Sequence, residues 1–452
     1  MKSVEAYTLD ERKNHILVKE KDKKQGLKCD QHSISGSVSQ RACVYCGARV
    51  VLNPITDAVH IIHGPIGCSS YTWDIRGSLS SGSEMFRNSF STDLQERDII
   101  FGGEKKLAGA IDEIVKVKSP ETIFVYSTCV VGVIGDDISA ICKQAEKKYN
   151  IRVIPVQSTG FAGSKKDGYK AACDAIIDLM DDKEYKMDIK DHTSLNYLGD
   201  FNLAGEIWIL NNYFREIGIH LITGVTGDST IASLKNAQNA AFNIVQCAGS
   251  SIYLARLMEE KFNIPFEQVS FFGIEDTSNS LRSIAKHTGD KQILQNTEKF
   301  IAAKKAEVQS NLQKYKEKCA GKKIAIYVGG GFKAISLMKQ FKELGMETVM
   351  VGTQTGMQEE YDTIKELAEE GTVILDDTNP SELEKFIKEK GADLLVGGVK
   401  ERPLAYKLGI AFIDHNHERK HPLAGYEGAV NFVKEVDLTI NSPVWDIIRK
   451  GR

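Results

Sequence analysis

The chain has 452 residues, of which 42% are hydrophobic and 26% charged, and its formal net charge is −3. Single hydrophobic cores stop growing well below this length, so we expect two or three ordinary globular domains rather than a disordered or fibrous chain. The near-balanced charge provides no field that would attract nucleic acid or an anionic membrane. The sequence has neither an apolar signal segment nor a membrane-spanning run, so we expect a cytoplasmic protein whose nine cysteines stay reduced.

The first forty residues are rich in lysine, serine and glycine and predict an irregular N-terminal arm, 1–40. After the arm, short apolar runs alternate with Gly/Ser/Thr-rich turns and amphipathic helices, which is typical of βαβ units. The predicted fold class is α/β, with three Rossmann-like doubly wound parallel-sheet domains at 41–195, 196–318 and 319–452. The clearest predicted strands are 121–127, 152–158, 322–331, 346–354, 371–377, 392–398 and 410–416.

Local motifs in the C-terminal third refine this prediction. Pro380 and Ser381 precede Glu384 at capping-box spacing, so the serine is expected to cap a helix there. The segment 329–334 matches GxGxxA, but the strand at 346–354 lacks the acidic residue that would hold a ribose, which argues against NAD. The sequence also lacks a GxxxxGK[ST] loop, so a partner would have to hydrolyse any ATP.

Three cysteines fall in glycine-containing turns, where ligands of open α/β sheets bind. They are Cys43 in RACVYCG, Cys68 in HGPIGCSS and Cys129 in YSTCVVG. Glycine lets the backbone approach a bulky anionic ligand, and thiolates are the usual ligands of iron-sulfur clusters. A cubane cluster normally takes four cysteines, so three from this chain would leave the fourth to another chain at a subunit interface.

The remaining cysteines are less distinctive. Cys46 forms a CxxC pair with Cys43, which could also indicate zinc or a redox dithiol, but no second pair accompanies it. Cys142 and Cys173 lie on apolar helix faces and are expected to pack in the core. Cys247 follows an apolar run and precedes a helix start, where a thiolate is favoured; spacing alone leaves a buried thiol equally open.

Polar residues also gather near the C-terminus. His415, His417 and His421 follow a predicted strand and could ligate metal or form a solvated loop. Lys400 follows the preceding predicted strand and could meet an anionic ligand or simply be solvated.

Several dispersed segments, in matching order, resemble component 1 of the nitrogenase superfamily from about Cys43 to the C-terminus. Within that superfamily the chain resembles the cofactor-assembly scaffold more than the catalytic α subunit. Tyr169 stands where the catalytic pattern has a histidine, and Gln246 and Gly249 stand where it has histidine and arginine around its cofactor cysteine. The resembling segments are 53–78, 90–107, 127–137, 196–208, 424–428 and 441–445.

The resemblance implies a role for each cysteine of interest. Cys43, Cys68 and Cys129 match three cysteines that hold a 4Fe-4S cluster together with one from the partner subunit. Cys247 matches the cysteine that anchors a large cofactor precursor, the 8Fe-9S-C L-cluster.

The resemblance also implies groups around that precursor. Lys400 and Arg76 match cationic positions near the cofactor pocket and are candidates for binding the anionic cluster or homocitrate. The family's far-end histidine corresponds to His415 when counted back from 425–428, but Asn416 takes that place when counted forward from Lys400.

The implied assembly is an α2β2 heterotetramer with a NifN-like β subunit. NifB would deliver the precursor, and the nitrogenase iron protein would hydrolyse ATP while molybdenum and homocitrate are inserted to form the FeMo cofactor. Whether the chain is itself an enzyme stays open. The alternatives are a catalytic α-type subunit of a nitrogenase-like reductase, such as an alternative nitrogenase or a methylthio-alkane reductase, and a metal-free nucleotide-binding α/β protein.

Overall fold

The computed structural model describes residues 10–21, 26–29, 42–73, 88–187, 191–246, 248–415, 419–445 and 447. Contacts within the chain divide it into two compact units. Unit 1 combines Met1–Arg41 with Val269–Arg452, and unit 2 is Ala42–Gln268. Among the described helices, none is both long and apolar enough to cross a bilayer.

Unit 2 contains two four-stranded sheets in which every neighbouring pair is parallel. The first sheet has the order β3-β2-β4-β5 and the second the order β7-β6-β8-β9. The strands are β2 (Val59–His63), β3 (Ser89–Ser91), β4 (Thr122–Ser127), β5 (Arg152–Val156), β6 (Ser194–Asp200), β7 (His220–Thr226), β8 (Phe242–Val245) and β9 (Phe266–Gln268).

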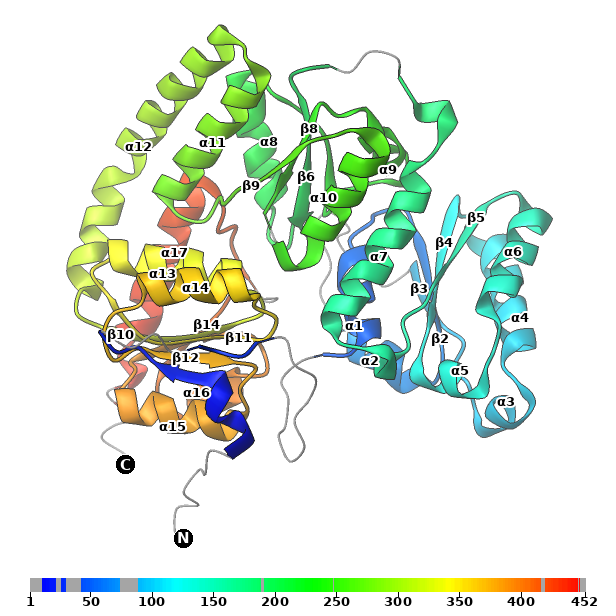
Figure 1. Ribbon diagram of the computed structural model, residues 1–452, viewed down its shortest axis with the longest axis horizontal. Coiled ribbons are helices and arrows are strands. Elements are labelled where there is room, and N and C mark those ends of the chain that lie inside the picture. The colour runs from blue at the N-terminus through cyan, green and yellow to red at the C-terminus, as the bar shows by residue number, and fades with distance from the viewer. Residues whose placement is uncertain are drawn as a thin grey trace. The chain divides into compact units, whose positions relative to one another are not determined.

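Helices cover both faces of the first sheet of unit 2 (Figure 1). Leu107 and Ile141, from α4 and α6, pack on one face, whereas α1 and α7 pack on the other. Helices α1 and α7 cross closely at Gly168. A Cβ there would lie only 2.0 Å from the Val44 carbonyl oxygen, so a glycine is needed. The helices are α1 (Val44–Leu52), α2 (Ile66–Trp73), α3 (Glu96–Phe101), α4 (Glu104–Lys118), α5 (Cys129–Ile134), α6 (Ile138–Tyr149), η3 (Gly160–Ala162), α7 (Lys165–Met180), η4 (Lys183–Tyr185), α8 (Glu206–Ile217), α9 (Ile231–Asn236), η5 (Ala237–Asn239) and α10 (Ala248–Phe262).

Unit 1 is built on a six-stranded sheet with the order β1-β12-β11-β10-β13-β14. Its strands are parallel except β1, which pairs antiparallel with β12. The five strands that the sequence predicts in the C-terminal third are confirmed, and each is fully or mostly buried. The strands are β1 (Ile16–Val18), β10 (Lys323–Val328), β11 (Glu347–Thr353), β12 (Val373–Asp376), β13 (Leu394–Gly397) and β14 (Ala411–Asp414).

The prediction of an irregular arm over 1–40 is wrong for residues 10–18. The apolar run Ile16–Val18 completes the edge of the sheet beside β12. Arg12, which is 2% exposed, contacts both carboxylate oxygens of Glu382 at 3.2 Å and donates to the Asp376 carbonyl oxygen at 2.7 Å. A short apolar triplet carries too little pattern to predict a strand, and its partner lies far along the chain.

Helices cover both faces of the unit 1 sheet, with α13 and α14 on one face and α15 and α16 on the other (Figure 1). Helix α12 packs along α17 and α11, so it belongs to the same unit as the sheet that follows it. The three predicted domain limits stay a prediction. The helices are η1 (Asp10–His15), α11 (Ile274–Thr288), α12 (Lys291–Cys319), α13 (Gly331–Glu343), α14 (Gln358–Leu367), α15 (Pro380–Lys390), α16 (Arg402–Leu408) and α17 (Gly425–Ile440).

The cap of α15 differs from the prediction. Asn379, not Ser381, is the N-cap, and its side-chain oxygen accepts from the Glu382 backbone N–H at 2.9 Å. Pro380 is the first helical residue, a position where its missing N–H costs nothing, so the residue before it becomes the cap.

Candidate metal centre

The three predicted cluster cysteines each lie at the start of a helix in unit 2. Cys43 is the N-cap of α1, Cys68 lies in the first turn of α2, and Cys129 is the first residue of α5. Helices α2 and α5 follow the neighbouring parallel strands β2 and β4, so their cysteines emerge at the same edge of the sheet. Backbone N–H groups at helix starts favour negative charge, which suits thiolate ligands.

Gly160 brings two of these cysteines together. A Cβ on Gly160 would lie 2.8 Å from Cys129 Sγ and 3.6 Å from Cys43 Sγ, so the two sulfur atoms flank one backbone point. Cys68 is close enough to be affected by both: burial raises the pKa of its thiol, and charge on Cys129 and Cys43 raises it further. The structure therefore brings Cys43 and Cys129 together and leaves Cys68 near enough for their charges to affect its pKa; their role as cluster ligands stays a prediction.

The loops that carry Cys68 and Cys129 are tied to each other. Thr128 Oγ1 donates to the His63 carbonyl oxygen at 3.0 Å. A Cβ on Gly64 would lie 2.1 Å from Thr128 Oγ1, so only glycine allows this approach. The glycine in the HGPIGC turn thus serves the packing of one cysteine loop on the other.

A buried histidine braces the same loops. His63, fully buried, lies 3.0 Å from Thr92 Oγ1 through Nδ1 and 3.1 Å from Asp136 Oδ2 through Nε2. Burial lowers the pKa of His63, although the carboxylate of Asp136 opposes this effect. Asp136 also accepts from the Gly103 N–H at 3.1 Å. The sequence did not predict this brace. The only local signal for it is His63 itself, the first residue of the HGPIGC turn.

The cysteine group lies at an open, apolar surface of unit 2. Cys129 is exposed, whereas Cys43 and Cys68 are half-buried. Around them, Val133 is 76% exposed, Phe161 65% and Ile66 55%. Phe161 adjoins the glycine between the sulfur atoms, and Ile66 lies two residues before Cys68. Exposed apolar side chains gathered in this way typically mark an interaction site.

The three thiols are the donor type that an iron-sulfur cluster takes. Within the described ranges, no three His, Cys, Asp or Glu side chains are grouped to ligate one metal ion. The irons of a cubane cluster are separate, so its thiolates stand farther apart than the ligands of one zinc ion. Three thiols without a carboxylate or imidazole among them are the donor type that iron-sulfur clusters take.

Four other cysteines, Cys46, Cys142, Cys173 and Cys319, are buried in the core. Cys46 is 4% exposed. Burial raises the pKa of Cys142 and of Cys173 to about 12, and both lie in apolar clusters, as predicted. Cys319, whose sequence surroundings are polar, is also fully buried.

Two predicted site residues, Cys247 and Arg76, lie outside the described residues. The residue before Cys247, Gln246, is 3% exposed, and its backbone N–H donates to the Leu198 carbonyl oxygen at 2.9 Å. Strand β8 ends at Val245 and α10 begins at Ala248. The elements on either side of Cys247 in the chain are therefore a strand before it and a helix after it.

Lys400 and His415 follow adjacent strands of unit 1. Strands β13 and β14 are parallel and pair Gly397 with Asp414, so the residues after them share one sheet edge. Lys400 is exposed. Glu401, 2% exposed, turns back and accepts from the Gly398 N–H at 2.8 Å, which fixes the turn that carries Lys400.

His415 points into the core of unit 1. It is 0% exposed and makes edge contacts with Phe272 and Phe432, with ring centroids 5.5 and 5.9 Å apart. Neither ring nitrogen has a hydrogen-bond partner among the described residues. Burial lowers the pKa of His415 far below its usual value, and the charges of Lys333 and Arg419 lower it further. Asn416, the competing candidate, lies outside the described residues, as does His417.

The structure adds a cation that sequence reasoning missed. Lys333, in α13, donates through Nζ to the His415 carbonyl oxygen at 3.1 Å. Lys333 belongs to the GGGFKA segment that resembles a dinucleotide motif. This segment follows β10, which is parallel to β13, so it begins at the same sheet edge as the turn that carries Lys400. A cationic edge of this kind suits an anionic ligand.

Comparison with known proteins defines the class to which this fold and cysteine group belong. Residues 43–441 match the family described as nitrogenase component 1 type oxidoreductase, and the chain belongs to that family. A solved structure titled "Nitrogenase Cp1 at pH 5" superposes with a TM-score of 0.87 at 32% identity, covering 97% of this chain and 96% of that one.

Within the family, this chain is similar to proteins named nitrogenase iron-molybdenum cofactor biosynthesis protein NifE. It is 63% identical to the one from Clostridium pasteurianum over 446 residues, with 97% of each chain covered. It is 51% identical to the one from Methanosarcina barkeri over 452 residues, with 98% of each covered. The chain is therefore a NifE-like nitrogenase component 1 protein.

Proposed function

We propose that this chain is one subunit of a scaffold on which the nitrogenase iron-molybdenum cofactor is assembled. The names of its relatives support this role, and they do not favour the alternative of a catalytic α-type subunit. The observation that supports the site is the approach of Cys43 and Cys129 to each other at Gly160, with Cys68 near enough for their charges to raise its pKa, beside exposed apolar side chains. These thiolates would hold a 4Fe-4S cluster, which supplies one-electron transfer when bound.

The exposed apolar rim supports a partner subunit at this cluster. A cubane cluster normally has four thiolate ligands, and this chain offers three there. A NifN-like β subunit would supply the fourth and would cover Val133, Phe161 and Ile66, which burial would favour by about 25 cal/mol per Å² of apolar surface. The complete assembly would be an α2β2 heterotetramer.

The cargo would be the 8Fe-9S-C precursor, which Cys247 would anchor. Its position before the start of α10 favours the thiolate form. Lys400 and Arg76 would meet the anionic groups of the cargo or of homocitrate, and Lys333 is placed to join them. His415 is a further candidate for binding the cargo, because neither of its buried ring nitrogens has a hydrogen-bond partner among the described residues.

The remaining steps need other proteins. We propose that NifB delivers the precursor, that the nitrogenase iron protein hydrolyses ATP, and that assembly takes place in the cytoplasm. What this chain contributes is binding and orientation. Its loops fix the cluster cysteines through the Thr128–His63 and His63–Asp136 hydrogen bonds.

The test is anaerobic co-purification of the chain with its partner subunit, followed by iron and sulfide analysis and EPR spectroscopy. Cys43→Ser and Cys129→Ser should each lose about four irons per chain and the cubane signal. Cys46→Ala, three residues from Cys43 but buried in the core, is the matched control and should keep both. Cys247→Ser should lose only the larger cluster.

Two outcomes would contradict the proposal. If Cys43→Ser and Cys46→Ala lost iron equally, the thiols would matter for folding rather than for ligation. If the wild-type complex were iron-free and colourless, the metal-free α/β alternative would replace the scaffold.

A further inference from the structure

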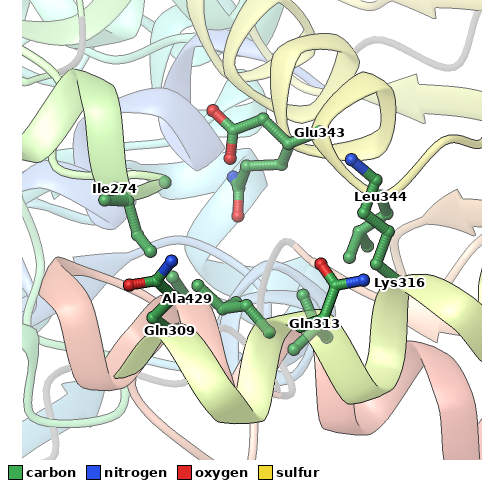
Figure 2. Close-up of a pocket in the computed structure, with 11 residues that line it drawn as sticks. Ile274, Gln309, Gln313, Lys316, Glu343, Leu344 and Ala429 are labelled. Atoms are coloured by element: carbon green, nitrogen blue, oxygen red, sulfur yellow. The ribbon is translucent and has the colours of Figure 1, made fainter. Parts of the chain in front are cut away.

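Unit 1 contains a cavity of about 170 Å³ between α11, α12, α13 and α17 (Figure 2). Gln309, Lys316 and Glu343 line it together with aliphatic side chains, a mixture that favours no single class of ligand. The chemistry that the proposed function leaves open lies in unit 2 instead. There, Cys43 and Cys129 carry free thiols before any cluster is bound, and their sulfur atoms approach the same backbone point.

Glycine at position 160 leaves the space between the two sulfur atoms open. A Cβ on Gly160 would lie 2.8 Å from Cys129 Sγ and 3.6 Å from Cys43 Sγ, so no side chain of residue 160 separates them. Rotation about a Cα–Cβ bond moves a cysteine sulfur by about 3 Å between staggered rotamers. Rotation of both side chains can therefore bring the two sulfur atoms toward the bond length of a disulfide, about 2 Å.

The two thiols differ in their access to solvent. Cys129 is exposed, whereas Cys43 is half-buried. A small oxidant from solution therefore reaches Cys129 first, and Cys43 lies close to whatever group Cys129 then carries. Cys46, which could compete for Cys43, is 4% exposed. Exposure and the shared approach to Gly160 both favour Cys129 as the partner of Cys43 over Cys46 of the CxxC pair.

We propose that Cys43 and Cys129 form a reversible disulfide in the cluster-free chain and that this bond blocks cluster loading. The proposal rests on the function proposed above, because it concerns the same thiols. A low-molecular-weight disulfide is the oxidant. Cys129 attacks it and releases one small thiol, and Cys43 then attacks the Cys129 sulfur and releases the second. The two cysteines lose two electrons and two protons, which the two released thiols carry away.

The disulfide acts as a redox-sensitive lock on the site. It uses two of the three thiolates that this chain offers to a cubane cluster, so loading must wait for a thiol reductant. While the bond lasts, both sulfur atoms are protected from oxidation to sulfinic acid, which thiols do not reverse. A partner subunit over the exposed apolar side chains beside Cys129 would close the approach of the oxidant, so the lock belongs to the free chain.

The experiment incubates the full-length, cluster-free chain with glutathione disulfide under argon and maps its disulfides by mass spectrometry of the peptides. We expect Cys43 joined to Cys129 as the main product in the wild-type chain. Cys46→Ala and Cys68→Ser should keep this cross-link, and Cys129→Ser should lose it. The same incubation in denaturing urea should lose the preference for the pair, because the preference depends on the folded site.

A second measurement follows iron uptake when the chain is mixed with its partner subunit, ferrous iron and sulfide. The cross-linked chain should take up no cubane iron, and prior reduction with dithiothreitol should restore uptake. The proposal is overturned if wild-type Cys43 is joined mainly to Cys46, if glutathione stays on Cys129 as the main product, or if the cross-linked chain loads like the reduced chain. Because disulfide mapping needs no iron, a reduced chain that fails to load would count against the proposed function alone.

Discussion

Glu401 should make the stability of unit 1 fall as pH rises. Burial raises the pKa of its carboxyl from 4.5 to about 7, and Asp414 adds to this, while the Gly398 N–H and the charge of Lys400 oppose it. Arg402 also faces this turn and contacts Asp414 at 3.4 Å. The folded chain therefore binds the Glu401 proton more tightly than the unfolded chain. The stabilisation is complete below about pH 4.5 and is lost as pH rises to about 7.

A rise in pKa from 4.5 to about 7 corresponds to roughly 3 kcal/mol between the protonated and the ionised carboxyl. Glu401→Gln removes this cost at alkaline pH, and its amide oxygen can still accept from Gly398. The new amide nitrogen takes the place of Oε1, which has no hydrogen-bond partner among the described residues, so about 1 kcal/mol is lost again. The expected net effect is a gain of about 2 kcal/mol at pH 8 and a loss of about 1 kcal/mol at pH 4.5, where only the cost of the unpartnered amide nitrogen remains.

Urea unfolding of the metal-free chain at the two pH values measures this difference. Glu384→Gln is the control, because hydrogen bonds from Lys388 and Lys407 lower the pKa of Glu384, so its removal should give no gain at pH 8. Equal effects of Glu401→Gln at both pH values would refute the reasoning, as would destabilisation at pH 8.

Three further substitutions test the site and the fold. Gly160→Ala would place a methyl group 2.8 Å from Cys129 Sγ, so we expect the purified complex to lose cubane iron while its circular dichroism stays native. His415→Leu removes two buried nitrogens that have no hydrogen-bond partner among the described residues, and it should stabilise the cluster-free chain by about 1–3 kcal/mol in urea; a loss of stability would mean that the imidazole is satisfied there. Arg12→Met leaves the buried carboxylate of Glu382 without its cation, with the Thr378 hydroxyl still donating to it, and should cost about 3 kcal/mol. Limited proteolysis should then release the N-terminal strand; an intact, equally stable chain would contradict the pairing.

The sequence determined most of the local structure and the kind of site. Apolar runs bounded by turn residues are local signals, so the strands of the C-terminal third and the α/β class could be predicted. Glycine-containing turns around Cys43, Cys68 and Cys129 are equally local, and the parallel sheet rule places such turns at one edge. The family match over residues 43–441 agrees with the predicted family and the solved relative agrees with the α/β class.

Only the tertiary structure decided what depends on distant partners. The short strand β1 has no periodicity that would predict it, and it forms by pairing antiparallel with β12. Cys319 lies among polar neighbours in sequence but is buried by the packing of its helix, and His415 faces Phe272 and Phe432 rather than solvent. Burial is a property of the assembled fold, since the elements that cover a side chain can lie far from it in the sequence. For that reason the pattern of residues along the chain could suggest the chemistry of the cysteines, whereas the approach of Cys43 and Cys129 at Gly160 had to come from the three-dimensional structure.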